Sequence, residues 1–337
     1  MYDPSSITQL PNRIPILVDK VTPTTHKTVE WMLHNVCNYD CTYCGEENKI
    51  GDRRWKSLDI YKMYIDKLIK ATGPNPWFLI TGGEPTLYPD FIELMAYLKS
   101  KGAYICLSTN GSRTLRWWNE YKEANVLDSL YVSYHTERTS DHKHIANVLN
   151  LFHDTPTKTI CFITHTHKTI DLAIEAVDFL YENTASKIEI KHMNTPGNPD
   201  MYSKLNSSQL DVIKKSYIGK KLDKTQSNIP VLNQYENKIS MTYDDDTVEV
   251  FNSSQELVKH GKNHYNNWMC NVSNNVLTVN VNLCRYGQMD CRVSGIVADL
   301  DVEEVSFIDE YVKCPYNSCY CSGNLFTRKY NNIDNLT

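Results

Sequence analysis

The sequence has no apolar run of about 18 residues, the length that a membrane-spanning helix requires. Residues 1–27 contain four prolines and no apolar core of a secretory signal, so we expect no export. The chain also has no long basic run, and 35 Lys and Arg against 40 Asp and Glu give a formal net charge of −5. A nucleic-acid backbone is therefore not the expected partner. These absences predict a cytoplasmic protein that binds neither membranes nor nucleic acid.

Cysteine, in contrast, is well represented, with 11 of 337 residues. Disulfide frameworks belong to short secreted chains, so we expect these thiols to bind metal in a reducing compartment. Cys37, Cys41 and Cys44 form a C-x3-C-x2-C run. Three thiolates this close can bind three irons of a [4Fe–4S] cluster and leave the fourth iron without a protein ligand. Zinc is the competing interpretation, but zinc usually takes four ligands in two close pairs, and no fourth ligand lies beside this triplet.

A second motif follows about forty residues later, where an apolar run ends in the turn Gly82-Gly83-Glu84-Pro85. Together the two motifs resemble the radical S-adenosylmethionine (radical SAM) superfamily. The resemblance implies that the cysteines bind a cluster, that SAM chelates its open iron, and that the turn meets the SAM amino group. Glycines let a backbone approach a ligand closely, and a carboxylate can accept hydrogen bonds from an ammonium. By the same resemblance, Tyr43 lies beside the adenine.

Short β-rich runs alternate with amphipathic stretches through much of the chain. The predicted strands are 28–34, 77–81, 104–109, 129–135, 159–164 and 187–193. Helices are predicted over 57–71, 91–99 and 170–180, with Ser57 and Asp90 as N-caps. This alternation predicts the α/β class and a parallel sheet with right-handed crossovers. Six units predict an open, partial (β/α)6 barrel similar to a TIM barrel, with ligands at the C-terminal strand ends.

Polar side chains follow several of these strands. The resemblance implies that the loops with Asn110 and Ser133 approach the methionine and ribose of SAM, and their amide and hydroxyl groups suit that contact. His135, His165 and His192 lie at the ends of the fourth, fifth and sixth strands. Their place at strand ends makes them candidates for catalytic or substrate-contacting residues.

The composition changes after residue 219. We expect an N-terminal extension over 1–27, the barrel over 28–219, and a linker with a small cysteine-rich α+β domain over 220–337. Alternating runs over 276–283 and 296–300 predict a hairpin in the last region. Its six cysteines are Cys270, Cys284, Cys291, Cys314, Cys319 and Cys321.

This cysteine-rich region resembles the SPASM or Twitch extensions of radical SAM enzymes, which bind two or one auxiliary [4Fe–4S] clusters. One fully ligated cluster needs four thiolates and two need about eight, so six favour one auxiliary cluster, and two clusters with open positions are the alternative. The expected ligands are Cys270, Cys291, Cys314 and Cys319, with Cys321 as a close substitute and Cys284 as a bystander. Four thiolates also make a structural zinc site, so zinc stays open here.

The resemblance implies an enzyme that cleaves SAM reductively to a 5′-deoxyadenosyl radical, with a flavodoxin or ferredoxin as electron donor. The radical abstracts a hydrogen from a C–H bond. Because enzymes with such an extension often modify peptides, we expect a peptide substrate, in a RiPP-type or protein modification. Residues 1–27 are too short for a winged-helix peptide-binding domain, which keeps a dehydrogenase or mutase of a small molecule, such as a sugar or nucleoside, as the alternative.

Two other classes stay open. A non-enzymatic iron–sulfur or zinc-binding interaction protein is disfavoured by the intact cysteine triplet and by Glu84. An RNA-modifying enzyme is disfavoured by the acidic charge and by the lack of a basic stripe with interleaved aromatic residues.

Overall fold

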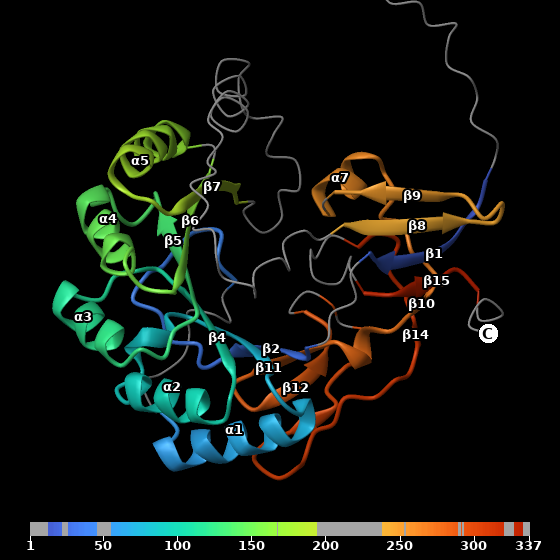
Figure 1. Cartoon of the computed structure of the whole chain (residues 1–337), viewed down its shortest axis with the longest axis horizontal. Helices are drawn as coiled ribbons and strands as arrows, with labels where there is room; N and C mark the ends of the chain where they lie inside the picture. The colour runs from blue at the N-terminus through green and yellow to red at the C-terminus, as the bar shows by residue number, and fades with distance from the viewer. Residues whose placement is uncertain are drawn as a thin grey trace, which may run out of the picture.

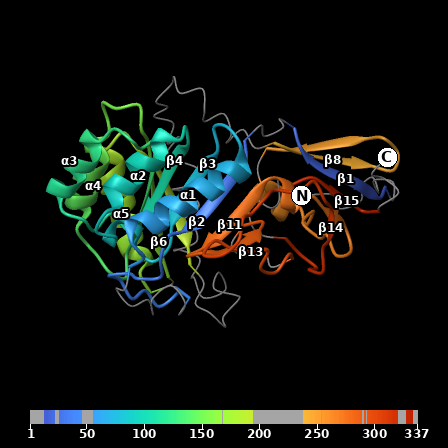
Figure 2. The same cartoon turned by 90° about the horizontal axis from the view of Figure 1, so that it is seen from below.

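The computed structural model has two β-sheets, which lie side by side in the two halves of the molecule (Figures 1 and 2). The residues that it describes are 13–21, 26–45, 55–166, 168–193, 238–252, 254–288, 291, 293–319 and 327–332. The start of the expected linker, residues 220–237, lies outside these ranges. Within them, none of the helices has the length and apolar character needed to cross a membrane.

The larger sheet contains all six strands that the sequence predicts. Its strands are β2 (Thr28–Met32), β3 (Trp77–Thr81), β4 (Tyr104–Thr109), β5 (Ser129–His135), β6 (Lys158–His165), β7 (Lys187–His192), β11 (Val276–Asn280), β12 (Leu283–Tyr286) and β13 (Ala298–Asp299). Their order is β13-β12-β11-β2-β3-β4-β5-β6-β7. Neighbours from β11 to β7 are parallel, and β12 and β13 continue the sheet in antiparallel pairs.

Five helices connect the parallel strands in turn. They are α1 (Leu58–Thr72), α2 (Phe91–Ser100), α3 (Leu115–Glu123), α4 (His142–Leu151) and α5 (Ile170–Asn183). In Figure 1 they form an arc along the outside of the sheet. A parallel sheet with its helices on one outer face confirms the predicted α/β class and the partial barrel. A short 3-10 helix, η3 (Pro85–Leu87), follows β3.

The first helix begins where the sequence predicts. The Ser57 hydroxyl accepts a hydrogen bond from the backbone N–H of Ile60 at 3.4 Å, which caps the helix. Asp90 occupies the N-cap position of α2 but makes no side-chain capping bond. Two further helices, α3 and α4, were not predicted, although each has an apolar face: Trp118 and Tyr121 of α3 and Ile145, Val148 and Leu149 of α4 are buried.

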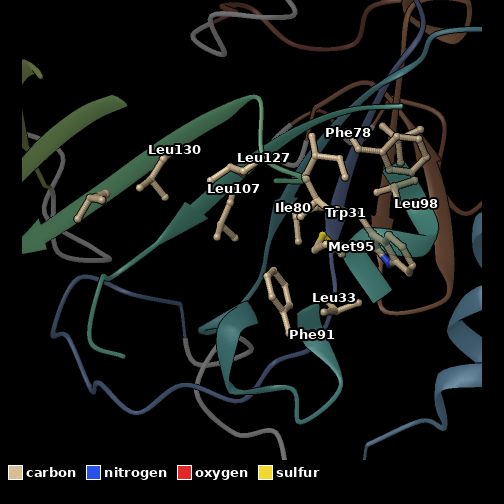
Figure 3. Packing of buried hydrophobic residues seen from close by; sticks show 14 of the residues in the cluster. Trp31, Leu33, Phe78, Ile80, Phe91, Met95, Leu98, Leu107, Leu127 and Leu130 are labelled. Atoms are coloured by element: carbon tan, nitrogen blue, oxygen red, sulfur yellow. The ribbon is translucent and has the colours of Figure 1, made fainter. Parts of the chain in front are cut away.

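The core fills the space between the larger sheet and its helices. Figure 3 shows side chains of β2 and β3, among them Trp31 and Phe78, packed near Phe91, Met95 and Leu98 of α2. All five are fully buried. Burial of each large apolar side chain contributes about 1.5–3 kcal/mol, so this layer fixes the spacing between strands and helices.

The second sheet joins the two ends of the chain. Its strands are β1 (Pro15–Lys20), β8 (Ile239–Tyr243), β9 (Val248–Phe251), β10 (Met269–Cys270), β14 (Val312–Lys313) and β15 (Lys329–Tyr330). They are antiparallel in the order β14-β10-β15-β1-β8-β9, so β1 lies between strands of the C-terminal region. A short helix, α7 (Ser254–Lys259), follows β9, and the 3-10 helix η6 (Val272–Asn274) follows β10.

The predicted C-terminal hairpin is wrong in its pairing. The run 276–280 forms β11, which does not pair with 296–300 but with β12 across the two-residue turn Val281-Asn282. It is β12 that pairs with the second run, with Leu283 opposite Asp299 and Cys284 opposite Ala298. Val281 has a positive φ of 58°, which a β-branched residue rarely adopts, so this turn does not have the Asn-Gly or Asp-Gly pair typical of a two-residue hairpin. The C-terminal region also extends the barrel sheet, since β11 lies parallel to β2.

Candidate active site

A cavity of about 300 Å³ opens at the C-terminal ends of the parallel strands. It is lined by the cysteine loop after β2, the glycine turn after β3, the ends of β4 and β5, and one residue after β7. The lining residues are Cys37, Tyr39, Cys41, Tyr43, Cys44, Gly45, Thr81, Gly82, Gly83, Ser108, Thr109, Asn110, Ser133, His135 and Met193. The structure therefore brings together segments that are about 150 residues apart in sequence, at the strand ends where ligands bind in this architecture.

The three cysteines of the first motif form one corner of this cavity. The pKa of Cys37 is raised to about 11, mainly by burial and to a smaller extent by the charges of Glu84, Cys41 and Cys44. The hydrogen bond from the backbone N–H of Tyr39 opposes this shift. Burial also raises the pKa of Cys41, which the guanidinium of Arg138 opposes. A cationic ligand would reverse these shifts and release protons from the thiols.

Among the described residues, no group of three His, Cys, Asp or Glu side chains is placed to hold a single metal ion. The thiolates of an iron–sulfur cluster bind different irons, so they need not converge on one point.

The glycine turn supports the cysteine loop directly. A Cβ on Gly83 would lie 2.1 Å from the carbonyl oxygen of Val36, and one on Gly82 would lie 2.5 Å from that of His34. The backbone N–H of Gly83 donates to the His34 carbonyl at 2.8 Å, and that of Glu84 donates to the Val36 carbonyl at 2.7 Å. Glycine is therefore required at both positions, because the chain that leads to Cys37 lies against this turn.

Glu84 lies behind the cavity wall. Its carboxylate is fully buried and accepts hydrogen bonds from the Thr86 hydroxyl at 2.6 Å, the Thr109 hydroxyl at 2.8 Å and the Asn110 backbone N–H at 2.7 Å. Burial raises its pKa, while these hydrogen bonds favour the charged form. Pro85 is also buried and outside the lining. Gly82 and Gly83 thus face the cavity, whereas the Glu84 carboxylate connects the ends of β3 and β4.

Tyr43 and His135 form a hydrogen-bonded pair with nearly parallel rings on the cavity wall. Their rings are 6.0 Å apart with an interplanar angle of 14°, and the Tyr43 hydroxyl and His135 Nδ1 share a hydrogen bond of 2.6 Å. His135 Nδ1 is also 3.6 Å from the Cys41 sulfur. Burial lowers the pKa of His135 to about 4, so its imidazole is neutral at pH 7.

The segment after β5 fastens the cysteine loop. The carboxylate of Glu137 accepts hydrogen bonds from the Thr42 backbone N–H at 3.0 Å and the Thr42 hydroxyl at 2.8 Å. The guanidinium Nη2 of Arg138 lies 3.8 Å from the carboxylate Oδ2 of Asp40. These contacts join positions 95 residues or more apart in sequence, so sequence reasoning missed them.

The remaining candidates of the barrel differ in their placement. Asn110 and Ser133 line the cavity, and the Asn110 amide donates to Asn38 at 2.9 Å. His165 is fully buried, its Nδ1 lies 3.1 Å from the Thr166 carbonyl oxygen, and it is not part of the cavity lining. His192 ends β7, and its side chain lies outside the described part of the structure.

Sequence reasoning missed several lining residues, including Tyr39, Thr81 and Met193. Tyr39 packs edge-on against His135, with ring centroids 5.8 Å apart. The C-terminal strand end at Thr81 and the position of Tyr39 inside the cysteine run were the available signals.

Four C-terminal cysteines gather at a second place, in and beside the smaller sheet. Cys270 lies on β10, and the backbone N–H of Cys314 donates to the Trp268 carbonyl at 2.8 Å. The pKa of Cys270 is raised to about 12, mainly by burial; the charge of Lys329 lowers it, and the charges of the other three thiols, those of Cys291, Cys314 and Cys319, contribute to the rise. The four thiols are therefore close enough to act on one another.

Cys284 is not among the thiols that act on these four. Cys284 is fully buried on β12, where burial raises its pKa to about 12 and the charges that act on it are those of Asp299, Glu303 and Lys67. Cys321 lies outside the described residues.

The model of the Radical SAM superfamily matches residues 31–199, just over half of the chain. The chain belongs to the radical SAM superfamily. Membership implies a [4Fe–4S] cluster and SAM, and the cavity fits them, because its lining offers three soft thiols from one loop and, among the described residues, no fourth cysteine.

Two curated proteins resemble this radical SAM chain over part of its length. The probable GTP 3′,8-cyclase of Pyrobaculum aerophilum is 32% identical over 136 residues, which are 40% of this chain and 42% of that protein. The Fe-coproporphyrin III synthase of Methanosarcina barkeri is 38% identical over 85 residues, 25% of this chain and 21% of that protein. The chain thus spans less than half the length of these relatives.

A solved structure, anSMEcpe with bound AdoMet, resembles the radical SAM chain more widely. It has a TM-score of 0.55 at 14% identity, and the match covers 82% of this chain and 78% of that one. At this identity the likeness shows the fold alone. Its coverage exceeds that of the family model, so the shared fold includes residues outside 31–199.

Proposed function

We propose that this chain is a radical SAM enzyme that modifies a peptide, with Cys37, Cys41 and Cys44 as ligands of a [4Fe–4S] cluster and SAM at its open iron. One observation carries the proposal: a single cavity is lined by these three cysteines, by the glycine turn and by the ends of β4 and β5. When bound, the cofactors would supply a 5′-deoxyadenosyl radical, which takes a hydrogen atom from the substrate. One electron from a flavodoxin or ferredoxin would cleave SAM into this radical and methionine.

The side chains and backbone of the cavity have separate tasks in this proposal. The glycine backbone of the turn approaches the SAM amino group, and Asn110 and Ser133 contact the methionine and ribose. The flat surface of the Tyr43–His135 pair suits the adenine. His135, neutral at pH 7, orients the Tyr43 hydroxyl, so we propose it as a positioning residue. For His165 and His192, a role at the substrate stays a prediction.

A peptide substrate is supported by the shared fold with anSMEcpe, which was also solved with AdoMet and the Kp18Cys peptide, at a TM-score of 0.52 and 82% coverage of this chain. The competing proposal is a small-molecule substrate. It is favoured by the 32% identity to a probable GTP 3′,8-cyclase, but that match includes only 136 residues. A non-enzymatic interaction protein is the remaining alternative.

We also propose one auxiliary [4Fe–4S] cluster at the C-terminal site, with Cys270, Cys291, Cys314 and Cys319 as ligands and Cys321 as a close substitute. The mutual electrostatic influence of the first four thiols supports this set. Their donor chemistry fits an iron–sulfur cluster, and it also fits structural zinc, so the metal must be measured.

The decisive experiment measures 5′-deoxyadenosine formation with SAM and dithionite after anaerobic reconstitution. We expect the wild type to form 5′-deoxyadenosine and Cys41→Ala to form less than 1% of that amount. Cys284→Ala is the matched control, because Cys284 is a buried cysteine outside both sites, and it should keep the wild-type activity. Activity in Cys41→Ala would remove the cluster assignment. No product from the wild type would favour the interaction protein.

The substrate class is tested separately by incubating the enzyme with a peptide library and with nucleotides. SAM turnover stimulated by a peptide, with a mass change in that peptide, would support the proposal. Stimulation by nucleotides alone would transfer the assignment to the small-molecule alternative.

A further inference from the structure

A buried lysine shares the C-terminal site with the four cysteines. Lys329 lies on β15, directly opposite Cys270 of β10 in the register of the two strands, and its side chain is only 2% exposed. Residues that are directly opposed on antiparallel strands have their side chains on the same face of the sheet. The lysine therefore extends from the same face as the thiol of Cys270.

The ammonium group of this lysine is held in a fixed place. Its Nζ donates a hydrogen bond to the carbonyl oxygen of Thr327 at 2.7 Å and lies 5.1 Å from the ring centroid of Tyr265, which is itself buried. The positive charge acts on the thiols of both Cys270 and Cys291, whose pKa values it lowers against the effect of burial. A charge in such a poorly solvated place acts more strongly on its neighbours than one in water.

A fixed cation has a specific consequence for a cluster bound here. Four thiolates around a [4Fe–4S] core give the group a net negative charge, and this charge grows by one when the cluster accepts an electron. A positive charge nearby therefore stabilises the reduced form more than the oxidised form, and local charge is one of the factors that set cluster potentials.

We propose that Lys329 tunes the auxiliary cluster by raising its reduction potential, so that the cluster more readily accepts the electron that an oxidised substrate radical releases. The inference rests on the proposed auxiliary cluster at Cys270, Cys291, Cys314 and Cys319. In the step that it favours, the cluster gains one electron and the substrate radical loses one.

The test uses the full chain with Cys37, Cys41 and Cys44 replaced by alanine, so that any remaining cluster belongs to the C-terminal site. Lys329→Met, Lys329→Gln and the charge-retaining Lys329→Arg are compared in this background after anaerobic reconstitution. Lys313→Met is the matched control, because Lys313 is exposed on β14 and pairs with Met269, next to Cys270. Iron and sulfide per chain are measured first, and the midpoint potential is then followed by EPR in a dithionite titration.

We expect Lys329→Met and Lys329→Gln to disfavour reduction at least tenfold, which lowers the midpoint potential by about 59 mV for a one-electron couple. Lys329→Arg and Lys313→Met should stay near the parent value. Neutral variants that bind the full iron with an unchanged potential would overturn the proposal.

Cluster binding provides a second readout. If the neutral variants lose the iron while Lys329→Arg keeps it, the need for a charge is supported; if all three lose it equally, the side-chain shape matters and the proposal is wrong. If the parent background binds zinc, or no iron, the auxiliary cluster itself fails, and the inference fails with it. That result is distinct from a loaded cluster whose potential does not respond to Lys329.

Discussion

At the scale of single residues, Glu84 illustrates how a side chain can serve the cavity from behind its wall. The sequence motif draws attention to its carboxylate as a ligand for an ammonium group. In the structure this carboxylate instead accepts hydrogen bonds from Thr86, Thr109 and the backbone of Asn110, and it is fully buried. Its contacts hold the start of the Asn110 loop against the glycine turn.

We therefore expect Glu84→Gln to destabilise the fold. The amide oxygen can replace only one carboxylate oxygen, and the NH₂ group would face a donor, which leaves a buried group unsatisfied at a cost of about 2–3 kcal/mol. Chemical denaturation of the metal-free protein measures this loss in the free energy of unfolding. The exposed Glu93→Gln, on α2, serves as the control and should change stability by less than about 0.5 kcal/mol. Equal effects of the two substitutions would contradict the assigned hydrogen bonds.

His34 carries a pH-dependent part of the stability. Burial lowers its pKa to about 4 in the folded chain, below the ordinary value of 6.5, while hydrogen bonds with the backbone oppose the shift only in part. The unfolded chain binds the proton more readily, so the stabilisation is complete above about pH 6.5 and is lost as the pH falls towards 4.

The loss should total about 3.5 kcal/mol, at about 1.4 kcal/mol for each pKa unit between 6.5 and about 4. Urea unfolding between pH 7 and 4.5 should therefore give a less steep pH dependence for His34→Gln than for the wild type. Parallel curves would show that His34 does not titrate as the structure indicates.

At the scale of elements, the parallel strands were predictable and several of their partners were not. The bounds of β3, β4 and β5 agree with the sequence, because each is a short apolar run between turn residues. The pairing of β11 with β2 joins residues more than 240 positions apart in the sequence, so no local sequence pattern predicts it.

The candidate site divides in the same way between predictable and hidden parts. The cysteine triplet and the two glycines stand out in the sequence and line the cavity. The contacts of Thr42 with Glu137, and the burial of His165, follow from tertiary packing alone.

The docking of the C-terminal region on α1 gives a prediction at this scale. Lys67 donates hydrogen bonds to the carbonyl oxygens of Leu300 and Glu303 at 2.7 and 2.9 Å, whereas Lys70 makes an exposed ion pair with Glu304. Lys67→Ala should cost about 1–3 kcal/mol, since it leaves carbonyl groups without their donor. Lys70→Ala should cost less than about 1 kcal/mol. Denaturant midpoints of the two variants compare these contacts directly, and a larger effect at Lys70 would contradict them.

At the scale of the whole molecule, the second sheet combines a strand from the start of the sequence with strands from the C-terminal region. β1 comes from the start of the chain but lies between β15 and β8, and its Val18 is fully buried in the small core with Met241, Tyr265 and Trp268. Cys319 packs against the same core. The second sheet and the C-terminal cysteines should therefore depend on the N-terminal strand.

Val18→Asp tests this dependence, because it places a charge in that core without touching the barrel. If the two proposed clusters are present, the wild type should bind about eight irons and the variant about four, which the cysteine triplet retains. Val250→Asp is the matched control, since Val250 is 48% exposed on β9 of the same sheet, and it should keep the wild-type iron. Loss of all iron in Val18→Asp would mean that the halves fold as one unit, and undiminished iron would mean that the C-terminal cysteines do not need β1.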